Sequence, residues 1–135
     1  MSRVIGVVAE YNPFHNGHYY HLQKAKQEAE ADFCVAVISG NFTQRGETSI
    51  VNKWAKAYMA ICGGADLVIE LPTLYSVSSA ENFANGAIKI LDSLKIVDSF
   101  AFGAEADDLA TLNNIANVLY LSLIHISEPT RHSLI

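Results

Sequence analysis

The sequence predicts an α/β fold, a doubly wound parallel sheet with helices on both faces. Short, continuously apolar runs alternate with longer segments rich in helix-forming residues, and loops containing Gly, Asn or Pro separate them. Such alternation implies parallel strands joined by right-handed crossovers. The 135 residues, half of them apolar, are enough for one domain with a buried core.

Four apolar segments are the predicted strands. They are Arg3–Glu10, Asp32–Ser39, Asp66–Pro72 and Val97–Gly103. A proline ends the third strand, because proline has no N–H to donate within a sheet.

The first two predicted helices follow the first two strands. Residues 18–31 are rich in helix formers. The second helix is expected to start after a cap at Asn52 and to end at Gly63, with Trp54 packed in the core and the lysines at 53 and 56 in solvent.

Two further helices complete the alternation. Ser78 and Glu81 match a capping box at the start of the third. One apolar face of that helix is expected to be Phe83, Ala87, Ile90, Leu91 and Leu94. The fourth helix is predicted over Asp107–Tyr120.

Composition excludes some classes of function. A net charge of −5 argues against nucleic-acid binding by this chain alone, because neutralising phosphates requires clustered Lys and Arg. No apolar run approaches the ~18 residues of a membrane span, so no membrane partner is expected. Cys34 and Cys62 lie in apolar neighbourhoods and are predicted to be buried thiols in a reducing cytoplasm.

The last fifteen residues differ from the rest. The segment LSLIHISEPTR, Leu121–Arg131, resembles a translated reading frame of a transposase adapter used in sequencing libraries. The alternative is an ordinary amphipathic strand. We therefore expect a partial ATP-binding domain over residues 1–120 and an adapter-derived tail over 121–135, with the domain truncated after four strands.

The turn after the first strand carries the strongest chemical signal, His15-Asn16-Gly17-His18. Ligands of open α/β sheets bind at the carboxyl ends of the strands, and the helix that follows offers unpaired N–H groups to a phosphate. Gly17 allows close backbone approach, and both imidazoles can donate hydrogen bonds to phosphate oxygens. A zinc site with His21 is disfavoured by helical spacing and the lack of acidic or Cys ligands nearby, so no metal ligand is predicted. Surface histidines without chemistry are the other alternative.

The motif HNGH resembles the HxGH signature of the nucleotidylyltransferase superfamily. The flanking segments GVVAEYNPFHNGHYYHL, SGNFTQRGE, KWAKAYMAICGGADLVIELP, AENFANGAIKIL and FAFGAE together resemble the bacterial tRNA(Met) cytidine acetate ligase family. The resemblance covers about Val4 to Glu105 and implies a Rossmann-like nucleotidylyltransferase (HUP-type) domain with strand order 3-2-1-4.

The resemblance also implies an activity. Members of this family use ATP, with Mg²⁺, to activate acetate as acetyl-adenylate and then acetylate N4 of the wobble cytidine of elongator tRNA(Met). Acetate is already ionised at pH 7, so its attack on the α-phosphate requires positioning and charge stabilisation without a general base. Two alternatives stay open, a small-molecule adenylyltransferase and a nucleotide-binding module without turnover.

The resemblance also implies site residues, at the positions of this sequence that match the family's motifs. His15 and His18 are the expected catalytic residues. The expected ATP-binding residues are Val8, Ala9, Glu10, Tyr11, Asn12, Pro13, Phe14, His15, Asn16, Gly17, His18, Tyr19, Tyr20, His21 and Gly103. Gly103, after the strand expected beside the first, is expected to face His15 and His18 across the switch point, with simple turn chemistry as the alternative.

The loop after the second strand is a second candidate. Ser39, Asn41, Gln44 and Arg45 are close enough to that strand's end to reach substrate or phosphate, although a solvated loop explains them equally well. Glu70, before the proline that ends the third strand, is expected to make a structural hydrogen bond rather than to take part in catalysis.

Overall fold

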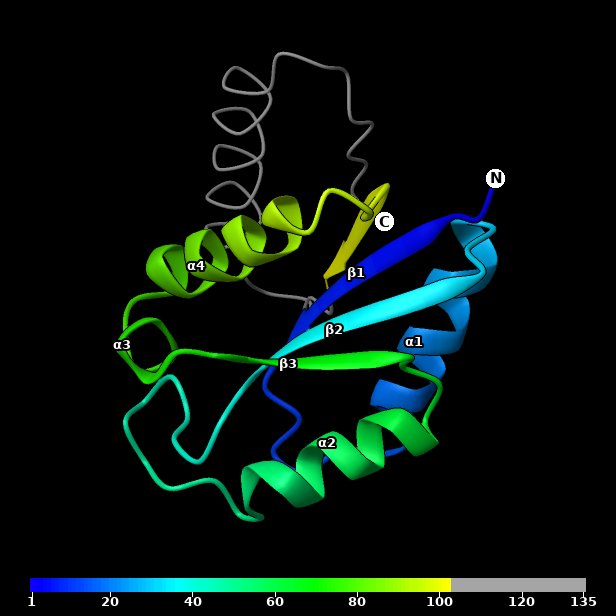
Figure 1. Cartoon of the computed structure of the whole chain (residues 1–135). Coiled ribbons are helices and arrows are strands. Elements are labelled where there is room, and N and C mark those ends of the chain that lie inside the picture. Colours follow the sequence, from blue (N-terminus) through cyan, green and yellow to red (C-terminus); the bar gives the residue numbers. More distant parts are fainter. Residues whose placement is uncertain (103–135) are drawn as a thin grey trace.

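The computed structural model describes residues 1–102, which alternate between strands and helices as predicted (Figure 1). The elements are β1 (Val4–Ala9), α1 (Asn16–Glu28), β2 (Phe33–Ser39), α2 (Lys53–Cys62), β3 (Leu67–Leu71), α3 (Thr73–Ser76), α4 (Ala80–Ser93) and β4 (Ser99–Phe102). Each strand is one to three residues shorter than its predicted segment. The short α3 was not predicted, and the helix expected over residues 107–120 lies outside the described residues.

The four strands form one parallel sheet in the order β3-β2-β1-β4. Val4 to Ala9 pair with Phe33 to Ile38 on one side of β1, and Ile5 to Val8 pair with Ser99 to Phe102 on the other. This topology confirms the predicted fold class and strand order. The carboxyl ends of β1, β2 and β3 therefore lie at one edge of the sheet, where open α/β sheets bind ligands.

Successive side chains of the buried strands enter two separate cores. Val4 and Val8 of β1 pack with Val35 and Val37 of β2 under α4. Ile5 and Val7 face the opposite side, together with side chains of α1 and α2. Figure 1 shows α4 on one face of the sheet and α1 and α2 on the other. Both faces are covered, which explains why the strands are continuously apolar.

The helix α4 follows its predicted apolar pattern. Phe83, Ala87 and Leu91 are buried against the sheet, and Ile90 and Leu94 are partly buried beside them. The predicted cap is wrong by one residue. Ser79, not Ser78, accepts a hydrogen bond from the backbone N–H of Asn82, and Glu81 lies in the first turn, where its charge favours the helix dipole.

The orientation of α2 contradicts the sequence prediction. Trp54 is 76% exposed, whereas Lys56 is fully buried. The sequence analysis placed Trp54 in the core, but the face that packs on the sheet carries Lys56 and the small Ala60. The lysine tolerates burial because its ammonium group finds two hydrogen-bond acceptors at the end of β2.

The two cysteines also differ in exposure. Cys34 on β2 is buried as predicted, but Cys62 at the end of α2 is exposed, so its predicted burial is wrong. Burial raises the pKa of the Cys34 thiol to about 12, with the Asp66 carboxylate adding to the rise and Lys26 opposing it. Within residues 1–102, no helix is long and apolar enough to cross a membrane.

We expect iodoacetamide at pH 8 to alkylate Cys62 and spare Cys34 in the native chain. The raised pKa keeps the Cys34 thiol protonated, and the thiolate is the reactive form. Mass spectrometry of tryptic peptides should find one label on native protein and two after unfolding in guanidinium. Equal labelling of both native cysteines would contradict the burial of Cys34.

Candidate functional site: the loop between β1 and α1

Two histidines cap the first helix at the carboxyl end of β1. His15 is the N-cap of α1, and its Nδ1 accepts a hydrogen bond from the backbone N–H of Gly17 at 3.0 Å. The backbone N–H of His15 donates in turn to Nδ1 of His18 at 3.2 Å. This reciprocal pair is a capping box in which imidazoles replace the usual Ser and Glu.

The capping box determines which ring nitrogen carries the proton. Because both Nδ1 atoms accept hydrogen bonds, each neutral ring bears its proton on Nε2. The two rings stack with centroids 3.7 Å apart and planes 20° apart. Two Nε2–H donors therefore come from neighbouring, parallel rings at the N-terminus of a helix. Such an arrangement suits a phosphate group, which accepts hydrogen bonds and is favoured by the helix dipole.

Gly17 and the aromatic residues of the loop hold this pair of rings. A Cβ atom at Gly17 would lie 2.9 Å from Cε1 of His15, so a side chain there would displace the ring. Tyr11 contacts His18 edge-on at 4.9 Å between ring centroids and contacts Phe14 at 4.7 Å. Burial raises the pKa of the Tyr11 phenol, which therefore stays neutral.

The loop is also attached to the loop that follows β2. The side-chain oxygen of Asn12 accepts hydrogen bonds from the Ser49 hydroxyl at 3.0 Å and from the backbone N–H of Ile50 at 2.7 Å. A carboxylate oxygen of Glu10 accepts from the backbone N–H of Gln44 at 3.3 Å. Two predicted site loops are thus brought together.

The buried side chain of Lys56 stabilises this junction between the loops that follow β1 and β2. Its ammonium group donates to the Ser39 hydroxyl at 3.1 Å and to the Gly40 carbonyl at 2.9 Å. The Ser39 hydroxyl donates onward to the carbonyl of Glu10 at 3.4 Å. Burial lowers the pKa of Lys56, and the carboxylates of Glu10 and Glu70 oppose that shift. A single buried side chain therefore links α2, the end of β2 and the end of β1.

The other predicted site residues have varied surroundings. The Val8 side chain belongs to the core, so only its backbone can reach a ligand at this edge. Asn41 accepts a hydrogen bond from the backbone N–H of Lys53 at 2.8 Å, which orients the start of α2. Arg45 and Tyr20 are exposed. Gly103 lies outside the described residues, and its predicted contact stays a prediction.

The sequence analysis did not identify Lys56 as a buried residue of the site. The signal available was its place among small residues, since Ala60 lies four positions later on the same helix face. Within residues 1–102, no group of three or more His, Cys, Asp or Glu side chains is arranged to hold a metal ion.

Comparison with known proteins gives one family match. The model of the HIGH Nucleotidyl Transferase family matches residues 2–133. A protein of Thermoanaerobacter pseudethanolicus named tRNA(Met) cytidine acetate ligase is 59% identical over 131 residues, which are 97% of this chain and 33% of that protein. A Clostridium botulinum protein of the same name is 51% identical, over 98% of this chain and 31% of that protein.

This chain is also similar to a protein whose crystal structure is known. The crystal structure of Thermotoga maritima TmcAL bound with alpha-thio ATP is similar with a TM-score of 0.76 and 45% sequence identity. The match covers 88% of this chain and 29% of that one. The chain thus spans about a third of the length of the curated relatives it matches.

Two substitutions of His15 should show whether the stability of α1 depends on a cap acceptor or on the imidazole ring itself. His15→Ala removes the acceptor for the Gly17 N–H, and we expect the free energy of unfolding to fall by about 1 kcal/mol. His15→Asn supplies another good N-cap acceptor and should leave stability near that of the unmodified chain. Chemical denaturation followed by circular dichroism measures both. If the two variants unfold alike, the capping role of His15 is wrong.

Proposed function

Because the chain belongs to the HIGH nucleotidyl transferase family, we propose that it binds ATP at the β1–α1 loop as part of an ATP-dependent ligase. The proposed ligase activates acetate as acetyl-adenylate and acetylates N4 of the wobble cytidine of elongator tRNA(Met). The observation that carries the proposal is the stacked pair of His15 and His18, with both Nε2–H donors at the start of α1. The names of the relatives supply the acetate and the tRNA.

The first half-reaction follows from the donors at this site. A carboxylate oxygen of acetate attacks the α-phosphorus of ATP, and the bond from that phosphorus to the bridging oxygen breaks to release pyrophosphate. Negative charge grows on the phosphate oxygens as the transition state forms. The Nε2–H groups of His15 and His18 and the N–H groups at the start of α1 stabilise that charge, at up to ~3 kcal/mol for each well-placed donor. The loop from Val8 to His21, with Gly103, is the proposed binding segment.

The remaining components are inferred from chemistry. Mg²⁺, if bound, is proposed to arrive on the triphosphate, since Mg²⁺ in such sites is held largely by substrate phosphates and water. The amine N4 of cytidine then attacks the acetyl carbonyl carbon, AMP leaves with the bond electrons, and the N4 proton is released. Ser39, at the end of β2, and Asn41, Gln44 and Arg45, in the loop that follows, are proposed to contact these substrates. The proposed place of action is the cytoplasm, where tRNA is modified.

Removing the imidazole donors should weaken ATP binding whether or not the helix cap is kept. We expect His15→Asn and His18→Gln, which retain cap acceptors, to bind ATP about ten- to hundredfold more weakly, because hydrogen bonds to charged groups are worth ~1.5–3 kcal/mol. Isothermal titration calorimetry of the 135-residue chain measures this. Lys89→Ala, on the exposed face of α4, is the matched control. Unchanged affinity in both histidine variants would overturn the proposed role of the loop.

The chain spans about a third of the length of these relatives, so turnover is best tested within a relative's full length. We therefore propose a chimaera in which residues 1–102 replace the matching segment of the Thermoanaerobacter pseudethanolicus protein. With acetate, ATP and tRNA it should yield AMP, pyrophosphate and acetylated tRNA, and His18→Gln should slow pyrophosphate release by ~10²-fold. A stable dinucleotide-type product would instead indicate a small-molecule adenylyltransferase. Full pyrophosphate release by His18→Gln would show that the loop is not catalytic.

A further inference from the structure

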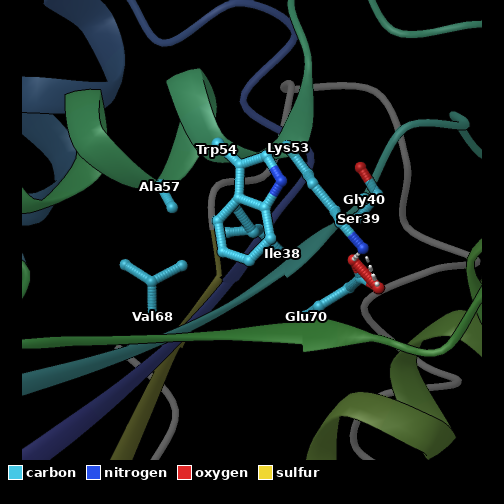
Figure 2. A pocket seen from close by; sticks show the side chains of 8 residues that line it. All are labelled: Ile38, Ser39, Gly40, Lys53, Trp54, Ala57, Val68 and Glu70. Atoms are coloured by element: carbon cyan, nitrogen blue, oxygen red, sulfur yellow. Dashed lines mark hydrogen bonds and ion pairs between the residues drawn. The ribbon is translucent and has the colours of Figure 1, made fainter.

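A pocket of about 310 Å³ lies beside the proposed ATP site, between α2 and the ends of β2 and β3 (Figure 2). Its lining residues are Ile38, Ser39, Gly40, Lys53, Trp54, Ala57, Val68 and Glu70. The volume is at the lower end of the range for small-molecule sites, which starts at ~300 Å³. Apart from Ser39, no residue that has a role in the proposed function lines this pocket.

The lining is apolar inside, with one large aromatic side chain. Ile38, Ala57 and Val68 come from the sheet and from α2. Trp54 is 76% exposed, although tryptophan usually buries most of its surface. An exposed indole beside an apolar cavity offers a flat surface on which a planar ring can stack. Proteins that bind unpaired nucleic-acid bases use such aromatic surfaces.

An ion pair provides the polar side of the pocket. Figure 2 shows the Lys53 side chain reaching from α2 to Glu70 on β3, with the Trp54 indole beside it. The ammonium nitrogen lies 2.8 Å from one carboxylate oxygen of Glu70 and 5.5 Å from the Trp54 ring centroid. Both side chains are partly exposed, at 35% and 40%, so the pair is weak enough to open for a ligand.

The close approach of Glu70 to the end of β2 depends on Gly40. A Cβ atom at Gly40 would lie 2.8 Å from Oε2 of Glu70, the same carboxylate oxygen that lies 2.8 Å from the Lys53 ammonium. The glycine therefore leaves room for the Glu70 carboxylate beside the Ser39–Gly40 backbone. One hydrogen-bond acceptor and one donor are thus held side by side above an apolar cavity.

This pair complements the edge of a cytosine base. Cytosine presents an N4 amino donor next to the N3 and O2 acceptors, and a carboxylate is a known acceptor for cytosine N4. Glu70 can accept from N4 while Lys53 donates to N3 or O2. Uracil has a carbonyl oxygen in place of the amino group, so it would set an acceptor against the Glu70 carboxylate. The order of donor and acceptor therefore favours cytosine.

We propose that this pocket receives the target cytosine, extruded from its RNA strand, with the base stacked on Trp54 and its edge bound by Glu70 and Lys53. The inference rests on the proposed function and names the substrate-binding residues for its second half-reaction. Ser39 supports it, because this residue lines the pocket and also donates a hydrogen bond to the carbonyl of Glu10 in the ATP loop. Extruded bases are commonly bound in this way, by stacking and by hydrogen bonds to their pairing edge.

Trp54 is the single tryptophan of the chain, so its fluorescence reports directly on the pocket. We expect cytidine to quench this fluorescence saturably in the 135-residue protein, and uridine to bind at least tenfold more weakly. Glu70→Ala should weaken cytidine binding by about tenfold, the scale of losing one base-reading contact. Glu28→Ala, which removes a partly exposed ion pair with Lys24 on α1, is the matched control and should change nothing.

The outcomes separate this inference from the proposed function. If ATP binds by calorimetry but cytidine does not quench, or uridine and cytidine bind equally, the pocket is not the cytosine site and the ATP proposal stands. Equal cytidine binding by Glu70→Ala and the unmodified chain also overturns the inference. If selective cytidine binding is found in a chain that does not bind ATP, the pocket assignment is supported and the ATP proposal fails. Circular dichroism of each variant confirms that it is folded.

Discussion

The site depends on the hydrogen bonds that the buried ammonium group of Lys56 makes. This group donates to the Ser39 hydroxyl and to the Gly40 carbonyl, and Ser39 donates onward to the carbonyl of Glu10. Burying a charge is costly unless its hydrogen bonds are satisfied, so the end of β2 is held where those acceptors meet the ammonium. The loops after β1 and β2 take their relative positions from this contact.

The two halves of the proposed reaction share this supported edge of the sheet. On one side, the mutual cap of His15 and His18 fixes both ring orientation and proton position. On the other side, the pocket beside Trp54 is bounded by the same Ser39 and Gly40 that accept from Lys56. A displacement of the end of β2 would therefore disturb both the histidine pair and the pocket. Preorganised donors of this kind stabilise developing charge without having to reorient during the reaction.

Much of the fold could be predicted because it depends on local pattern. Continuous apolar runs identified all four strands, their alternation with helices predicted a parallel sheet, and the strand order followed from the family resemblance. Besides the cap of α4 and the short α3, the main error concerns which face of a helix is buried. On α2, Trp54 was assigned to the core and Lys56 to solvent, yet Trp54 is exposed and Lys56 is buried. A helix with apolar residues on more than one face does not reveal its buried side by spacing alone.

The sequence by itself determined the alternation of strands and helices and the placement of HNGH at the first strand–helix turn. Those features depend on neighbours in the chain, through burial periodicity and helix capping. Only the tertiary structure decided that His15 and His18 stack with both protons on Nε2, and that Lys53, Trp54 and Glu70 line one pocket. Lys56 reaches acceptors 16 and 17 residues away in the chain. Contacts at that separation are set by how the helix packs on the sheet, which local pattern does not encode.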